Sequence, residues 1–202
     1  MTKIILVNGP PGSGKDTIGW DIMEWINDNA YPMMGYISIE KLALPLRKIV
    51  FALAEGELDI EQDKDKQVMF GGLTPRKIMQ SASEDWLKRL AGPNVFAELL
   101  SQRIDTHYVI YDHIEHHYVV VTDCGFQTEV DYIVDKYGED NVYLIRMMRE
   151  GCNFIGDTRE FTSIPKRSHF ATITNNGSYD DLKSAAASVL SVWFGKKEAE
   201  SD

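Results

Sequence analysis

A short apolar run followed by a glycine-rich turn constrains this chain more than any other feature. Residues 4–7 read Ile-Ile-Leu-Val, and residues 9–17 read Gly-Pro-Pro-Gly-Ser-Gly-Lys-Asp-Thr. Apolar residues then recur at helical spacing from Ile18 to Ile26. The predicted order is buried strand, glycine-rich loop and helix. This is the context that the phosphate-binding pattern G-x-x-x-x-G-K requires.

The loop at residues 9–17 has the chemistry of a phosphate cradle. Its glycines let backbone N–H groups turn toward phosphate oxygens, and the dipole of the following helix favours negative charge. Lys15 is expected to contact the β- and γ-phosphates of ATP and so to be catalytic. A plain glycine-rich turn is the alternative, which Lys15 and the flanking elements disfavour. We predict that the nucleotide contacts Gly9, Pro10, Pro11, Gly12, Ser13, Gly14, Lys15, Asp16 and Thr17.

The residue after Lys15 departs from the usual Walker A pattern. That pattern has a Ser or Thr whose hydroxyl binds Mg²⁺, whereas this chain has Asp16 followed by Thr17. We predict a rearranged Mg²⁺ site with Asp16 and Thr17 as candidate ligands. Asp16 is also a catalytic candidate, which places the metal or acts as a base. The alternative for Asp16 is an ordinary acidic residue in the first turn of a helix.

Strands alternate with helices along the rest of the chain, which predicts an α/β fold of three layers with a mainly parallel central sheet. A length of 202 residues suits one domain, residues 1–202. Residues 147–167 are charged and weakly periodic, so we expect a mobile lid there. Residues 195–202 are expected to form a disordered tail. Further strands are predicted at 36–39, 118–122, 142–145 and 170–174, and further helices at 42–53, 74–90, 95–104, 130–137 and 182–194.

Composition limits the function classes. The formal charge of −10 argues against a large nonspecific nucleic-acid surface. The two cysteines, Cys124 and Cys152, are far apart and lack metal-ligand spacing, which indicates free thiols and a reducing cytoplasm. No run of residues is long and apolar enough for a membrane span, so no membrane partner is expected.

Asp123 follows the predicted strand at residues 118–122, and this places its carboxylate at the edge of the sheet where α/β folds bind ligands. There it could hold Mg²⁺ or accept a proton from an acceptor hydroxyl. The alternative is that Asp123 caps the next helix. Phosphoryl transfer also needs arginines that converge on developing negative charge. The candidates are Arg149 and Arg159 for catalysis, Arg146 for the nucleotide, and Arg47 and Arg76 for the acceptor.

The chain resembles the phage deoxynucleoside monophosphate kinases. The resemblance covers most of the chain and is carried by residues 9–17, 43–47, 74–77, 121–123 and 173–177. It implies a P-loop kinase fold that uses ATP and Mg²⁺. It also implies that Asn176 lies beside the adenine, with a simple turn as the alternative. Related kinases commonly form homodimers, so a homodimer is an expected partner.

One position separates this chain from that family. The strand that ends at Asp123 is commonly followed by the pattern Asp-x-Arg, but here the arginine is replaced by Gly125, with Phe126 next. Together with residues 83–85 and 149–159, this is similar to the phage 5-hydroxymethyldeoxyuridine (5-hmdU) DNA kinases. The similarity implies transfer of phosphate to the hydroxymethyl group of 5-hmdU in phage DNA, a step in thymidine hypermodification. Gly125 would then leave room for the base, and Phe126 would contact it.

Two other functions remain open. A deoxynucleoside monophosphate kinase would make dNDP from free dNMP and would clamp the acceptor phosphate with another arginine. A P-loop ATPase or regulatory nucleotide-binding module would hydrolyse ATP without a phosphorylated acceptor. A DNA substrate must also meet a basic patch on this acidic chain. The residues available for it are Arg47, Lys48, Arg76, Lys77, Lys88 and Arg89.

Overall fold

The computed structural model describes residues 1–29, 35–55, 57–110 and 116–195. Within these residues, five parallel strands form one sheet in the order β2-β3-β1-β4-β5. The strands are β1 (Thr2–Asn8), β2 (Gly35–Glu40), β3 (His116–Cys124), β4 (Val142–Met148) and β5 (Phe170–Thr174). The central position of β1 places the loop that follows it at the middle of one sheet edge.

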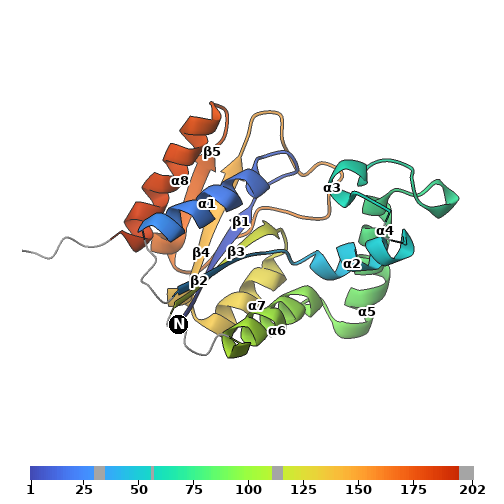
Figure 1. The fold of residues 1–202 in the computed structure, drawn as a ribbon, viewed down its shortest axis with the longest axis horizontal. Helices are drawn as coiled ribbons and strands as arrows, with labels where there is room; N and C mark the ends of the chain where they lie inside the picture. The colour runs from blue at the N-terminus through green and yellow to red at the C-terminus, as the bar shows by residue number, and fades with distance from the viewer. Residues whose placement is uncertain (30–34, 56, 111–115, 196–202) are drawn as a thin grey trace, which may run out of the picture.

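Helices cover both faces of the sheet (Figure 1). On one face, α1 (Lys15–Asn29) and α8 (Tyr179–Phe194) pack on a core that includes Ile5 and Val7. On the other face, α6 (Val95–Ile110) and α7 (Gln127–Tyr137) pack on a core that includes Ile4 and Leu6. Because successive strand residues point to opposite faces, an apolar run such as β1 belongs between two helical layers. The predicted three-layer α/β fold is confirmed.

A set of short helices extends beyond the end of the sheet at which β1 meets α1 (Figure 1). The predicted helix at 74–90 begins as expected, because the Thr74 side chain accepts a hydrogen bond from the Lys77 amide and Pro75 occupies the first turn. The set contains α2 (Leu44–Leu53), α3 (Ile60–Asp63), η1 (Phe70–Gly72), α4 (Pro75–Ser81), η2 (Ala82–Leu87) and α5 (Lys88–Ala91). The helices α3, η1 and α5 bury none of their residues.

The connection between β4 and β5 is anchored to β1 near its C-terminal end. Asn8 donates a hydrogen bond to the Glu160 carbonyl (2.9 Å) and accepts one from the Thr162 amide (3.1 Å). Thr162 is fully buried and Ile164 is nearly so. Any lid motion is therefore confined to the residues before Glu160, and the mobility predicted for 147–167 stays a prediction. Two short helices, η3 (Glu139–Asn141) and η4 (Arg167–His169), precede β4 and β5.

The remaining predictions concern the tail, the thiols and the membrane. Helix α8 ends at Phe194, and residues 196–202 of the predicted tail lie outside the described residues. Cys124 and Cys152 are both free thiols, as predicted. Among the helices of the described ranges, none has the length and apolar character of a membrane span.

Candidate active site

The loop between β1 and α1 has a backbone that demands glycine. Gly12 and Gly14 have φ values of 79° and 97°, in the left-handed region that other residues avoid. A Cβ atom on Gly14 would lie 2.5 Å from Nδ2 of Asn175. That amide donates a 3.0 Å hydrogen bond to the Ser13 carbonyl and so braces the loop from the end of β5. The predicted strand, loop and helix order is present, with α1 beginning at Lys15.

Lys15 stands where the loop meets a cavity that Asp16 and Asp123 also line. Its ammonium donates a 2.7 Å hydrogen bond back to the Pro10 carbonyl. Burial, followed by the positive charge of Arg159, lowers the pKa of Lys15 to about 8. A bound phosphate would raise the pKa of Lys15 again, because its negative charge favours the protonated ammonium.

The negative charges of Asp16 and Asp123 act to raise the pKa of Lys15, against the larger effect of burial. Asp16 accepts a hydrogen bond from Oγ1 of Thr122 (2.8 Å) and pairs with the Lys41 ammonium (3.0 Å). Burial acts to raise the pKa of Asp16, but Lys41 and Thr122 outweigh it and the pKa lies below its ordinary value. Asp16 therefore stays ionised. Thr17, the other predicted Mg²⁺ ligand on this helix, is exposed and does not line the cavity.

Asp123 has both carboxylate oxygens engaged. They accept hydrogen bonds from the backbone amides of Leu42 (2.8 Å) and Ala43 (2.9 Å). Asp123 thus anchors the segment that leads into α2. It does not cap the following helix α7, whose N-cap is Phe126 and has no side-chain cap hydrogen bond. Burial raises the pKa of Asp123 despite these two donors. Asp123 also lines the cavity, where a second interaction at either oxygen remains available.

Oxygen ligands suit Mg²⁺, which is commonly held by one or two carboxylates together with substrate phosphates and water. Asp16 and Asp123 provide such carboxylates beside the phosphate loop. Within the described residues, no cluster of three or more His, Cys, Asp or Glu side chains forms a closed metal cage. The residues present fit a metal that arrives with a nucleotide.

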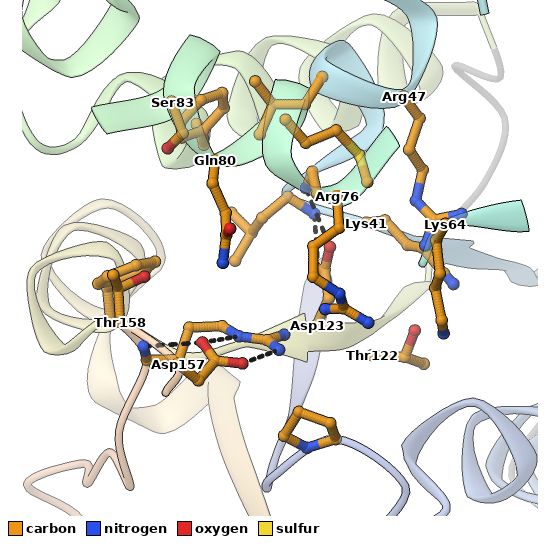
Figure 2. A pocket seen from close by; sticks show the side chains of 18 of the residues that line it. Lys41, Arg47, Lys64, Arg76, Gln80, Ser83, Thr122, Asp123, Asp157 and Thr158 are labelled. Atoms are coloured by element: carbon orange, nitrogen blue, oxygen red, sulfur yellow. Dashed lines mark hydrogen bonds and ion pairs between the residues drawn. The ribbon is translucent and has the colours of Figure 1, made fainter. Parts of the chain in front are cut away.

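A cavity of about 240 Å³ runs from the loop toward α4 and α7. Besides Lys15 and Lys41, four cations line it. Figure 2 labels three of these, Arg47, Lys64 and Arg76, which come from α2 and from the segment around α3 and α4. The fourth, Arg159, comes from the connection between β4 and β5. Each arginine is held by an acid: Arg47 by Glu61, Arg76 by Asp65, and Arg159 by Asp157.

Gly125 and Arg159 fit closely together. A Cβ atom on Gly125 would lie 2.6 to 2.8 Å from the Cδ, Cγ and Cβ atoms of Arg159. The guanidinium of Arg159 makes two hydrogen bonds to Asp157, of 2.9 and 2.6 Å. From the sequence, we expected Gly125 to leave room for an acceptor base. That expectation is wrong, because the aliphatic part of the Arg159 side chain occupies the space. The chain lacks the family arginine at position 125 but brings another arginine against that position.

The other predicted site residues are distributed on both sides of the loop. Arg149 donates to the Gly12 carbonyl (3.2 Å), and Asn176 accepts from the Glu150 amide (2.8 Å), so both lie near the loop. Phe126 lines the cavity with the Lys88 ammonium 3.4 Å from its ring centroid. Arg146 instead donates to the Thr162 carbonyl (2.8 Å) and does not line the cavity. The nucleotide roles of Arg146 and Asn176 stay predictions.

Lys41 and Glu129 are two of the cavity residues that the sequence interpretation did not name. Lys41 follows directly after β2, and the rule that ligands gather at the carboxyl ends of parallel strands could have found it. Glu129 is only 2% exposed, and burial raises its pKa to about 8. An acidic residue in the first turn of a helix looks ordinary in a sequence, so no sequence signal marks Glu129.

Comparison with known proteins adds limited information. No protein-family model and no curated protein matches the chain. A gluconokinase from Sinorhizobium meliloti 1021 is similar in structure, with 13% identity, a TM-score of 0.49, and coverage of 95% of this chain and 93% of that chain. A sugar kinase from Janibacter sp. HTCC2649 is also similar, with 16% identity and a TM-score of 0.43. The match covers 95% of this chain and 96% of that chain. At these scores and identities, neither likeness assigns a function to this chain.

Proposed function

We propose that this chain is an ATP-dependent kinase that transfers the γ-phosphoryl group to a hydroxyl acceptor. The observation that carries the proposal is the position of Lys15, which stands where a glycine-shaped phosphate loop opens into a cavity lined by acceptor-side cations. A site for ATP hydrolysis alone would not need the additional cavity lined by these cations. Group transfer requires a place for an acceptor next to the triphosphate, and the cavity provides it.

The residues divide the work of transfer as follows. The loop amides and Lys15 would hold the β- and γ-phosphates, and Asp16 would hold Mg²⁺, which would neutralise charge at the phosphates. Asp123 accepts the proton of the acceptor hydroxyl while the hydroxyl oxygen bonds to the γ-phosphorus. The bond from that phosphorus to the bridging oxygen breaks, and ADP leaves. Arg159 and Arg149 stabilise the charge on the transferred phosphoryl group.

For the acceptor, we infer the hydroxymethyl group of 5-hmdU in DNA. Support comes from the sequence resemblance and from the cavity lining, which includes Phe96, Phe126 and Met79 and the neutral groups Gln80 and Ser83. Such a lining suits a flat, uncharged ring. On an acidic chain, binding relies on local cations, and the base must turn out of the DNA stack to reach the cavity.

A deoxynucleoside monophosphate kinase is the second candidate, and one observation favours it. Arg47, Lys64, Arg76 and Arg159 all line the cavity, and arginines in such a group can bind an acceptor phosphate in a bidentate manner. The corrected role of Gly125 strengthens this candidate, because Arg159 supplies an arginine where the family pattern lacks one. A homodimer remains a prediction for either enzyme.

One transfer assay separates the candidates. ATP labelled at the γ-phosphate is incubated with DNA that contains 5-hydroxymethyluracil, with the same DNA containing thymine, and with each dNMP. Label in the modified DNA alone supports the DNA-base kinase. Label in dNMP alone makes the chain a nucleotide kinase. Release of labelled phosphate without any labelled acceptor would overturn both and would leave an ATPase.

A further inference from the structure

A buried carboxyl group in the cavity has no assigned partner. Glu129, the third residue of α7, is 2% exposed and contributes to the cavity lining. Across the part of the chain that the structure describes, no hydrogen bond or ion pair reaches its side chain. A carboxyl group so deeply buried is costly unless something pairs with it. The missing partner is therefore sought in the ligand.

Glu129 and Lys15 enter the cavity from helices on opposite faces of the sheet, Glu129 from the first turn of α7 and Lys15 from the start of α1. Lys88, Asp123, Glu84 and Arg159 influence the pKa of Glu129. The charged groups that influence the pKa of Lys15 are Arg159, Asp16, Asp123 and Asp157. Asp123 and Arg159 are common to both sets, so Glu129 and Lys15 face one cavity. Glu129 lies in the first turn of α7, whose N-cap is Phe126, and is thus positioned to contact an acceptor that lies against Phe126.

The nearest cation is already occupied. The Lys88 ammonium donates a 2.8 Å hydrogen bond to Glu84 and lies 3.4 Å from the centroid of the Phe126 ring. Burial outweighs the attraction of Lys88 and Arg159 and raises the pKa of Glu129 to about 8. At neutral pH, the side chain is mainly a carboxylic acid. In that form it offers one O–H donor and one C=O acceptor in a single plane.

We propose that Glu129 recognises the base of the acceptor by hydrogen-bonding the imide edge of a uracil-type ring. The carboxyl O–H donates to a ring carbonyl oxygen, and the carboxyl C=O accepts the neighbouring ring N–H. In 5-hydroxymethyluracil, a carbonyl of this edge is adjacent to the carbon that carries the hydroxymethyl group. Holding the edge therefore fixes the position of the reacting hydroxyl. The proposal rests on the proposed acceptor class.

The test compares two substitutions with opposite chemistry. Glu129→Leu keeps the bulk but removes both hydrogen bonds, so the KM for DNA containing 5-hydroxymethyluracil should rise roughly 10- to 100-fold, with a smaller change in kcat. Glu129→Gln keeps one donor and one acceptor, so its KM should stay within about threefold of wild type. Asp135→Leu, at an exposed position of α7, serves as the control.

A pH profile adds a readout that a structural role would not produce. The wild-type KM should increase as the pH rises through about 8, because ionisation removes the O–H donor. The Glu129→Gln variant should show no such increase. The thermal midpoint of Glu129→Leu should match or exceed that of wild type, because an apolar side chain is cheaper to bury than a carboxyl group.

The outcomes are distinct from those of the kinase assay. If only dNMPs are phosphorylated, the proposed acceptor is wrong, and the same variants are then compared on dTMP, which has the same imide edge. If nothing is phosphorylated, binding of the nucleoside 5-hydroxymethyldeoxyuridine is measured by calorimetry. In each case, a Glu129→Leu variant that behaves like Asp135→Leu, or a Glu129→Gln variant as impaired as Glu129→Leu, overturns the role of Glu129.

Discussion

The phosphate loop and the opposite wall of the cavity are built in different ways. The loop relies on backbone geometry: Gly12 and Gly14 have positive φ values, and Asn175 braces the Ser13 carbonyl. The opposite wall relies on long side chains from α2, α4, α7 and the β4–β5 connection. Its arginines are each neutralised by an acid of the same chain. On the proposed function, the nucleotide side is preformed, whereas a charged acceptor group would have to displace these ion pairs to bind.

If the loop side is the fixed half, removing its one lysine should have the largest effect. Lys15→Ala should lower kcat/KM for phosphoryl transfer on the order of 1,000-fold, because no other residue can replace its charge at the β- and γ-phosphates. Circular dichroism should show an intact fold. The matched control is Lys183→Ala on α8, which removes an exposed pair with Glu24. A Lys15→Ala enzyme within tenfold of its control would contradict the comparison.

The acceptor wall can be tested through the fit of Gly125 against Arg159. Gly125→Ala places a methyl group where the Arg159 stem lies, 2.6 Å from the nearest atom, so the arginine must move. We expect transfer to fall roughly 10- to 100-fold. Combining Gly125→Ala with Arg159→Ala should add little to Arg159→Ala alone, because the two changes act on one contact. Strictly additive losses would mean that Gly125 acts without Arg159.

Asp123 joins the two halves, and its substitution should affect stability as well as rate. An asparagine can accept from only one of the Leu42 and Ala43 amides with its single carbonyl oxygen, so Asp123→Asn should lower the free energy of unfolding by about 1 to 3 kcal/mol. Urea denaturation measures this change, with Asp135→Asn at an exposed position as the control. A loss of activity with unchanged stability would show that the two backbone hydrogen bonds are dispensable.

The smallest expected effect is proton uptake by Lys15 when ATP binds. Lys15 has a pKa of about 8 in the free protein, and phosphate binding should return it toward its ordinary value. At about pH 8.5, where ATP is fully ionised, binding should then take up roughly 0.7 proton. Calorimetry in buffers of different ionisation enthalpy measures this uptake. The Lys15→Ala variant should take up none, and uptake that persists in it would assign the proton to another group.

The sequence predicted the loop half well because its signals are local. The apolar run at β1 and the glycines that follow lie within a few residues of one another, and the strand-end rule placed Asp123. It could not show that Arg159 packs on Gly125, since the two residues are 34 positions apart in the chain, with α7 and β4 between them. Alternation along β4 also predicts that Arg146 faces away from Ile145 and Met147, which pack beneath α1 and α8; the nucleotide role of Arg146 stays a prediction.

The hold of Asn8 on residues 160–162 affects how the chain responds to proteolysis. The β4–β5 connection has an exposed tip at Ile155, which is 90% exposed, and a protease would cut there first. On one side of the cut, Arg149 is bonded to Gly12. On the other side, the Glu160 amide is bonded to the Gly125 carbonyl, in addition to the contacts of Asn8. The nicked chain would therefore remain one particle and separate into two fragments only in denaturant.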